Sequence, residues 1–368
     1  MKLFITYEYF LPAYKAGGPV QSLANLAANY TNANIYIFCR HTDMDGSVLT
    51  NVKHDEWVTY NHHTKVYYTT GKETVYNVLT TINPDVVFIN GIFSPRFNIK
   101  PLFWTGSGRK IVSARGMLHP GALSQKSLKK KLYLVAYKLL GLHKKCVFHA
   151  TTEEEKGYIQ NTFGSDTTVY VAPNFPNVIR TLPMPAREAG SLRLLSVALI
   201  SPMKNIKLVL EALAACKANV VYDIYGPVKD AAYWEECKTV ITTLPQNIKV
   251  HYHGAIPPHQ VQDALAACHC FILPSKSENF GHAIYEAFAA GRPVITSHNT
   301  PWNDLEKYRA GFNVDINNTS TIANAIEAMA AADNNAMQQY SNGAVQYATD
   351  KIDITSIKKS YDAMFVNT

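Results

Sequence analysis

The chain alternates short β-rich runs with helical stretches, and it does so twice, which constrains its fold more than any other feature. Up to about residue 175 the runs are KLFITYE, NIYIFCR, KVYYTT, DVVFING, KIVSARG and KCVFHAT. After a proline-rich segment at 176–191, PNVIRTLPMPAREAGS, the pattern restarts with LRLLSVALI and continues to PVITS. Strands that alternate with helices predict a parallel sheet joined by crossover helices. We therefore predict an α/β protein with two Rossmann-like domains, whose parallel sheets face each other across a cleft.

The predicted domains are residues 1–178 and 179–351, and the final helical segment, 352–368, is expected to cross back to the first domain. A chain of 368 residues is long for a single core and fits two domains of ordinary size. Ligands often bind at the interface of two domains, so the cleft is the expected site.

The composition indicates a soluble, cytoplasmic protein. Hydrophobic residues make up 47% of the chain and charged residues 17%, and no apolar run has the roughly eighteen residues needed to span a bilayer. The start, MKLFITYEYF, is typical of a first strand rather than a signal peptide. The six cysteines have neither disulfide nor zinc-ribbon spacing, and we expect reduced, buried thiols.

The segment SENFGHAIYEAFAAG, residues 277–291, carries two glutamates eight positions apart, Glu278 and Glu286. It lies between two apolar runs, FILP and PVITS, which predicts a strand, a turn, a helix and another strand. In open α/β sheets, ligands bind at the carboxyl ends of the strands. A helix N-terminus favours an anion there, yet this sequence supplies carboxylates. The expected ligand therefore has both anionic and hydroxyl-rich parts.

Much of the net charge of +7 lies in SQKSLKKKLYLVAYKLLGLHKK, residues 124–145. Lysines from Lys126 to Lys145 alternate with apolar residues at helical spacing, namely Leu128, Leu132, Val135, Leu139 and Leu140. This pattern predicts a basic amphipathic helix that suits an anionic membrane surface. A surface helix with an ordinary core face fits the pattern equally well. We expect no nucleic-acid partner, because no recognisable binding module accompanies the basic residues.

Five motifs occur in one order between residues 16 and 300: AGGPVQSLANLA, ARGML, VAPN, SPMKNIKLVLEAL and FILPSKSENFGHAIYEAFAAGRPVI. In this ordered set the chain resembles the GT-B-fold retaining glycosyltransferases of family four, the group 1 glycosyltransferases. The resemblance implies transfer of a sugar from a nucleoside-diphosphate sugar, with a UDP-sugar favoured over a GDP-sugar. The implied acceptor is a glycan or lipid-linked molecule in surface polysaccharide synthesis, at the inner face of the membrane.

The resemblance assigns the donor contacts to the second domain. It places Glu286 on the ribose hydroxyls and Glu278 on the transferred sugar, close to the reacting carbon, because ionised carboxylates accept strongly from hydroxyls. Lys204 of SPMKN matches the lysine that binds the diphosphate. The other donor-binding residues that it implies are Asn205, Ile256 and, through backbone N–H groups at the helix start, Asn279, Phe280 and Gly281.

One position departs from the family. An arginine usually precedes the lysine by five residues, in a Gly-Arg pair, and this sequence has Ala198-Leu199 there. The loss of a bidentate phosphate partner leaves Lys204, helix N-termini and a residue of the other domain to stabilise the leaving group. Arg115, where the family often has a histidine before glycine, is the expected additional catalytic cation.

Three more features of the first domain are candidates. Gly17 and Gly18 form the first strand-helix turn, where backbone N–H groups can approach a phosphate or acceptor. Asn90, at the end of the fourth run, is expected on the acceptor side. His119 either substitutes for the missing histidine or is a plain surface residue.

Neither a metal nor a cofactor is expected. Asp43-Met44-Asp45 has the D-x-D pattern of metal sites in another glycosyltransferase fold, but it occurs in a polar loop and indicates a solvated turn. The implied mechanism is front-face displacement, in which the departing phosphate helps to deprotonate the acceptor. Two alternatives stay open: a catalytically degenerate sugar-nucleotide-binding subunit, which Leu199 favours, and a sugar-nucleotide 2-epimerase, against which the paired glutamates argue.

Overall fold

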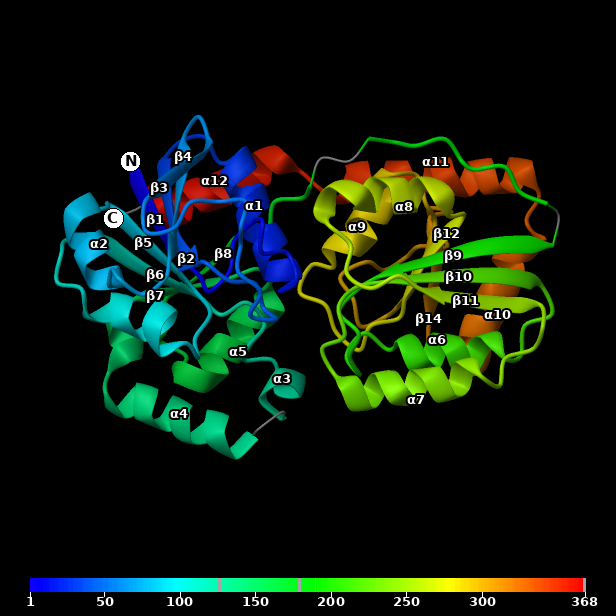
Figure 1. The fold of residues 1–368 in the computed structure, drawn as a ribbon, viewed down its shortest axis with the longest axis horizontal. Helices are drawn as coiled ribbons and strands as arrows, with labels where there is room; N and C mark the ends of the chain where they lie inside the picture. The colour runs from blue at the N-terminus through cyan, green and yellow to red at the C-terminus, as the bar shows by residue number, and fades with distance from the viewer. Residues whose placement is uncertain (125–126, 178–179, 189, 367–368) are drawn as a thin grey trace. The chain divides into compact units, whose positions relative to one another are not determined.

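The computed structural model describes residues 1–124, 127–177, 180–188 and 190–366, and the chain divides into two compact units (Figure 1). Unit 1 comprises Met1–Phe175 and Ile354–Thr368, and unit 2 comprises Pro176–Asp353. The predicted domain boundary, between residues 178 and 179, falls on positions outside the described residues. No described helix is both long and apolar enough to cross a membrane.

Unit 1 is built on an eight-stranded sheet in the order β3-β4-β2-β1-β5-β6-β7-β8. All neighbouring strands are parallel except β3, which is antiparallel to β4. The strands are β1 (Lys2–Thr6), β2 (Asn34–Arg40), β3 (Trp57–Asn61), β4 (Thr64–Thr69), β5 (Val86–Asn90), β6 (Arg109–Ser113), β7 (Val147–Ala150) and β8 (Val169–Val171). The residues of β5 are all buried, as expected for a parallel strand covered on both faces.

The helices of unit 1 connect these strands. They are α1 (Gly18–Asn29), α2 (Val75–Ile82), α3 (Pro120–Ser124), α4 (Ser127–Leu139), α5 (Glu153–Phe163) and α12 (Ile354–Val366), with the short helices η1 (Pro95–Ile99), η2 (Lys100–Phe103) and η3 (Leu142–Lys145). Helix α12 joins the core of unit 1 through Tyr361 and Phe365, whose rings contact Tyr30. The carboxyl end of the chain therefore completes the unit that its amino end begins.

Unit 2 has a parallel six-stranded sheet in the order β11-β10-β9-β12-β13-β14. Its strands are β9 (Ser191–Val197), β10 (Asn219–Tyr225), β11 (Ile248–Tyr252), β12 (Cys270–Leu273), β13 (Val294–Ser297) and β14 (Gly311–Val314). Its helices are α6 (Ile206–Leu213), α7 (Ala231–Ile241), α8 (Val261–Ala267), α9 (His282–Ala289), α10 (Thr319–Ala331) and α11 (Asn334–Lys351), with η4 (Pro258–Gln260). Helices α6, α7 and α10 cover one face of the sheet, and α8, α9 and α11 cover the other (Figure 1). The predicted fold class is confirmed in both units.

The basic segment differs from its prediction. It is not one helix to residue 145, because α4 ends at Leu139, Gly141 adopts a left-handed conformation, and η3 follows. Lys126 lies outside the described residues. The core face of α4 is formed by Leu134 and Tyr137. The apolar residues that predicted an amphipathic helix do not form an ordinary core face, because all of them are exposed: Leu128, Leu132, Val135, Leu139 and Leu140.

Candidate active site

The carboxyl ends of β9 and β12, which are neighbours in the sheet of unit 2, carry most of the predicted donor residues. The loop after β9 and the loop after β12 are bonded to each other. The Lys276 backbone N–H donates to the Met203 carbonyl at 2.9 Å, and Asn205 Nδ2 donates to the Pro274 carbonyl at 3.2 Å. Asn205, predicted as a donor-binding residue, is buried and begins α6 in a left-handed conformation. It therefore holds the two loops together.

Lys204 and Glu278 form an ion pair between these loops. Lys204 Nζ lies 2.5 Å from Glu278 Oε1, and the Ser275 hydroxyl donates to the same carboxylate oxygen at 2.7 Å. The side chains are 22% and 9% exposed, respectively, so water screens the pair only in part. A phosphate would compete with Glu278 for the ammonium group, and a hydroxyl could donate to the carboxylate. The pair thus presents one group for each part of the expected ligand. Ser275 was not predicted, although it lies only three residues from Glu278.

Glu286 lies on the buried face of α9 and is 7% exposed. Burial raises the pKa of its carboxyl group to about 7, and a hydrogen bond from Asn177 Nδ2 to Oε1, at 3.1 Å, opposes this rise. A side chain that bonds hydroxyl groups from a buried position needs a polar partner in the unliganded protein. Asn177 is that partner, and sequence reasoning missed it because 109 positions separate the two residues.

The raised pKa of Glu286 predicts how pH affects stability. The unfolded chain releases this proton near the ordinary glutamate pKa of 4.5 and the folded chain near 7, so the folded state binds more protons between these values. The free energy of unfolding therefore falls as pH rises through this window, by roughly 3 kcal/mol. Glu286→Gln has no such proton to lose. Its thermal midpoint should match the wild type at pH 4 and exceed it clearly at pH 8. An equal difference between the midpoints of the variant and the wild type at both pH values would contradict a raised pKa of Glu286.

The segment before α9 is held in place by contacts within unit 2. Trp302 Nε1 donates to the Phe280 carbonyl, and the rings of Phe280 and Trp302 lie 5.4 Å apart. Gly281 has φ 75°, and a Cβ atom there would lie 3.2 Å from both Ile284 Cδ1 and Trp302 Nε1. Asn279 is half-buried in the same turn. The glycine is therefore required by the backbone and its packing as well as by any approaching ligand.

Ile256 and Leu199 lie at the same edge of the sheet. Ile256 is half-buried in the segment after β11 and packs against the core of unit 2. Leu199, at the position of the family's arginine, follows β9 and is also half-buried. The site residues brought together by contacts in unit 2 are thus Lys204, Asn205 and Glu278.

Arg115 and Asn90 meet in unit 1, where Asn90 ends β5 and Arg115 follows the neighbouring strand β6. Arg115 Nε and Nη2 donate to Asn90 Oδ1 at 2.9 and 2.7 Å, and Nη1 donates to Asn174 Oδ1 at 2.7 Å. Burial lowers the pKa of Arg115, and its guanidinium lies 5.8 Å from the centre of the Phe88 ring. Asn174 belongs to the VAPN motif but was not predicted as a site residue. Three polar side chains thus form one network at the carboxyl ends of β5, β6 and β8.

His119 has a local structural role. Its Nδ1 accepts a hydrogen bond from the Gly121 backbone N–H at 3.0 Å, at the start of α3, and its ring contacts the edge of Tyr158 at 5.2 Å. The two glycines before α1 differ. Gly17 precedes the helix with φ 74°, whereas Gly18 is exposed and a Cβ atom there would meet nothing within 4 Å. The first turn of α1 therefore has open space for a ligand.

Asp43 and Asp45 occupy a turn, but Asp43 is not solvated as predicted. It is 4% exposed and accepts hydrogen bonds from the backbone N–H groups of Lys15 and Met44. Asp45 is exposed and pairs with the Lys15 ammonium group, which lowers the pKa of the carboxyl. The carboxylates thus anchor the loop that leads to Gly17. Local polarity predicted solvation, whereas the fold of unit 1 encloses Asp43.

Comparisons with known proteins identify a related family and similar folds. Residues 185–346 match the family described as glycosyl transferases group 1. Sucrose-phosphate synthase from Thermosynechococcus elongatus is similar in structure, with a TM-score of 0.75, 16% identity and 100% of each chain covered. Anabaena HepE in complex with UDP and glucose gives a TM-score of 0.74, 17% identity and 100% coverage of each chain.

A third similar structure is WaaG, a glycosyltransferase involved in lipopolysaccharide biosynthesis, with a TM-score of 0.68, 14% identity and 100% of each chain covered. No curated protein sequence matches the chain. At these identities the structural likeness establishes the fold, and the family match covers most of unit 2. The protein therefore has the GT-B fold, and residues 185–346 of its second unit match the group 1 glycosyltransferase family.

Proposed function

We propose that this protein transfers a sugar from a nucleoside-diphosphate sugar, most readily a UDP-sugar, to a hydroxyl group of a glycan or lipid-linked acceptor. The observation that carries this proposal is the Lys204–Glu278 ion pair between the loops after β9 and β12, with Ser275 on the same carboxylate. In the donor complex, Lys204 binds the diphosphate and Glu278 accepts from hydroxyls of the transferred sugar. Glu286 accepts from the ribose hydroxyls, in exchange for its hydrogen bond with Asn177.

The contacts of Glu278 support a binding role over a nucleophilic one. Its Oε1 already accepts from an ammonium group and a hydroxyl, so its charge is directed toward donors. We infer that the reaction retains the anomeric configuration by front-face displacement, in which the departing phosphate oxygen takes the proton of the acceptor hydroxyl. Catalysis then depends on positioning and on stabilisation of the leaving diphosphate, and Lys204 supplies positive charge for it. Asp43 and Asp45 serve the fold of unit 1, which supports a reaction that uses no metal there.

Two similar structures support the substrate classes. HepE has been crystallised with UDP-glucose, and WaaG acts in lipopolysaccharide biosynthesis. Both facts concern those proteins, and they favour a UDP-sugar donor and a surface polysaccharide product for this chain. In unit 1 we assign Asn90 to the acceptor side and Arg115, which bonds to Asn90 and Asn174, as an additional catalytic cation. The open first turn of α1 is assigned to an approaching phosphate or acceptor.

The exposed face of α4 supports work at a membrane surface. The side chains of Leu128, Leu132, Val135, Leu139 and Leu140 are 71%, 62%, 53%, 82% and 66% exposed. Such a row of large apolar residues is rare on a monomeric surface and needs a partner. Lys129, Lys131 and Lys138 are exposed beside this row, and their positive charges favour a negatively charged partner. We infer peripheral contact with the anionic inner face of the membrane, where a lipid-linked acceptor would be found.

Lys130 does not belong to this basic surface, although its neighbours do. Its ammonium group donates to the Ala122 carbonyl and lies 5.6 Å from the centre of the Phe93 ring. It therefore ties α4 to unit 1. A test of the membrane contact should leave Lys130 in place.

The donor assignment predicts different effects for the two glutamates. UDP-, GDP- and ADP-sugars are compared by thermal shift, and the true donor at a hundred times its dissociation constant should stabilise the protein by about 2.7 kcal/mol. Glu286→Gln should weaken binding of the free nucleoside diphosphate, because neutral hydrogen bonds are about half as strong as charge-assisted ones. Glu278→Gln should not weaken that affinity, because it removes the carboxylate that competes with the diphosphate for Lys204, and it should lower turnover. Calorimetry with the nucleotide and a sugar-release assay measure the two effects.

The same assays separate the alternatives. A transferase releases free sugar from the donor slowly when no acceptor is present. A degenerate subunit would bind the donor and release none, and a 2-epimerase would convert the donor sugar to its C2 epimer without releasing it. Unchanged nucleotide affinity in Glu286→Gln would remove that residue from the ribose site.

A further inference from the structure

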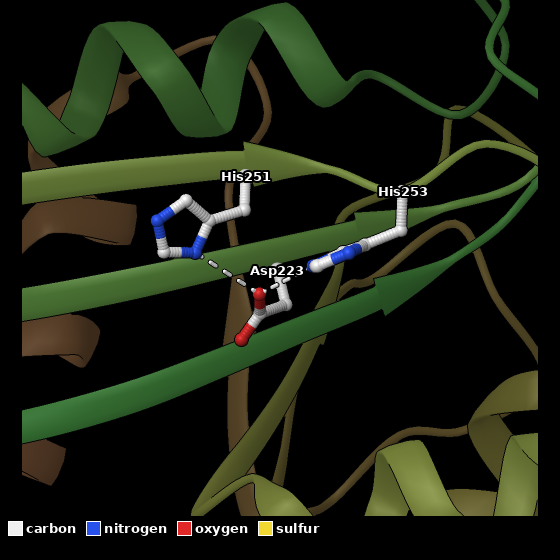
Figure 2. A group of neighbouring side chains, drawn as sticks. All are labelled: Asp223, His251 and His253. Atoms are coloured by element: carbon white, nitrogen blue, oxygen red, sulfur yellow. Dashed lines mark hydrogen bonds and ion pairs between the residues drawn. The ribbon is translucent and has the colours of Figure 1, made fainter.

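A second group of chemically active side chains lies on β10 and β11, at the edge of the sheet, and its nearest member is on the strand next to β9. It comprises Asp223 on β10 and His251 and His253 on and just after β11 (Figure 2). None of these residues contributes to the donor contacts described above. The first question is what fixes their positions, and the second is what they could bind.

The strand ladder fixes the backbone of all three residues. Asp223 and His251 are partners in the parallel register of β10 and β11, and the His253 backbone N–H donates to the Ile224 carbonyl at 3.0 Å. Burial alternates along β10, so Tyr222 and Ile224 face the core while Asp223 is on the opposite face. His251 and His253 are two positions apart and therefore share one face of the strand.

The side chains converge on one point. His253 Nε2 lies 2.7 Å and His251 Nδ1 3.3 Å from Asp223 Oδ1, and the three candidate ligand atoms lie within 4.8 Å of one another. Two ligands bound to zinc at about 2.0–2.2 Å in tetrahedral geometry are about 3.3–3.6 Å apart. The observed spacing thus needs small side-chain rotations only. The His253 ring is oriented by stacking on Tyr225, with ring centres 4.4 Å apart and planes 12° from parallel.

We propose that Asp223, His251 and His253 form a binding site for a borderline divalent cation, with Zn²⁺ as the best-suited ion. Two imidazole nitrogens and one carboxylate suit Zn²⁺ and its transition-metal neighbours, whereas Mg²⁺ and Ca²⁺ prefer oxygen ligands. The three side chains are 29%, 53% and 37% exposed in chain order, which leaves room for water at the remaining coordination positions. Because β11 is an edge strand, the ion would join it to β10.

Calorimetric titration of the untagged, chelator-stripped full-length protein with ZnCl₂ tests this site. We expect one tight Zn²⁺ site per chain and no comparable site for Mg²⁺. His253→Ala and His251→Ala should each weaken Zn²⁺ binding by about 100-fold or more, since even outer-shell changes at metal sites cost 10–100-fold. The exposed position of the site predicts that both variants keep the wild-type melting curve without metal.

Two further variants make the result decisive. Asp223→Asn keeps an oxygen that accepts the histidine N–H bonds but removes the charge, so loss of Zn²⁺ affinity in this variant identifies a ligand rather than a hydrogen-bond acceptor. His62 and His63 of unit 1 are the matched control, because they are also two adjacent imidazoles, with His63 Nδ1 3.0 Å from His62 Nε2. His62→Ala/His63→Ala should keep the tight site. The proposal is overturned if the tight site survives His253→Ala, or if it disappears with the control pair.

Discussion

Replacing Lys204 with alanine should lower turnover at saturating donor by about 10²–10³-fold, because removal of one preorganised charge from a leaving group has an effect of this size. The expectation is strong here because Leu199 stands where related enzymes have a second cation. Sugar-release and sugar-transfer assays on the purified variant measure this loss of turnover. Lys204→Arg keeps the charge and should restore part of the rate. Leu199→Arg should be neutral or activating.

The control must separate charge from position. Lys207 lies three residues away, at the start of α6, and its ammonium group is 2.7 Å from Glu236 Oε2 in a half-exposed pair. Lys207→Ala removes the same charge outside the site and should change turnover by less than about twofold. The variant Lys204→Ala also leaves the Glu278 carboxylate without its cation, which destabilises the fold. Turnover is therefore compared on folded protein, and a full rate in Lys204→Ala would exclude the lysine from the mechanism.

Charge reversal on α4 should abolish membrane binding with the donor site intact. Each lysine near an anionic bilayer contributes about 1 kcal/mol, so the loss of Lys129, Lys131 and Lys138 alone removes roughly 3 kcal/mol, or about 100-fold in partitioning. Replacement of all three by glutamate adds repulsion. Co-sedimentation with vesicles that contain anionic lipid measures the effect, and wild-type binding should be reversible and lost at high salt.

A matched control changes the same amount of charge elsewhere on unit 1. Lys53, Lys65 and Lys72 are exposed on and around β3 and β4, and their triple replacement by glutamate should leave vesicle binding largely intact. Leu132→Ser/Leu139→Ser tests the apolar part, since these side chains are exposed and their loss should weaken binding without lowering the thermal midpoint. If the wild-type protein ignores anionic vesicles at low salt, the α4 surface serves another purpose and a soluble acceptor becomes the better hypothesis.

The two experiments test different units of the protein. The Lys204 variants test the chemistry of unit 2, and the α4 variants test whether unit 1 binds the protein to a membrane. A variant that binds the donor and transfers sugar in solution but fails to reach vesicles would separate them. Such a result would leave the donor assignment standing and would move the question to the acceptor.

The fold class and the order of the donor motifs could be predicted from the amino-acid sequence. Buried parallel strands are short apolar runs, and their alternation with helices is a local property that the chain carries in its residue order. The turn and helix at 277–291 were predictable for the same reason, since Gly281 and the apolar spacing act within a few residues. The contacts that each motif makes could not be predicted in this way.

The partners of the site residues and the environment of α4 depend on contacts between distant parts of the chain. Lys204 and Glu278 are 74 positions apart, and the ion pair depends on β9 and β12 being neighbours in the sheet. The raised pKa of Glu286 follows from burial, which no local pattern encodes. In α4, apolar residues occur on two faces, and spacing shows which residues share a face but not which face the core covers. Leu134 and Tyr137 face the core and Leu132 and Leu139 face outward, because the long-range packing of unit 1 leaves the second face uncovered.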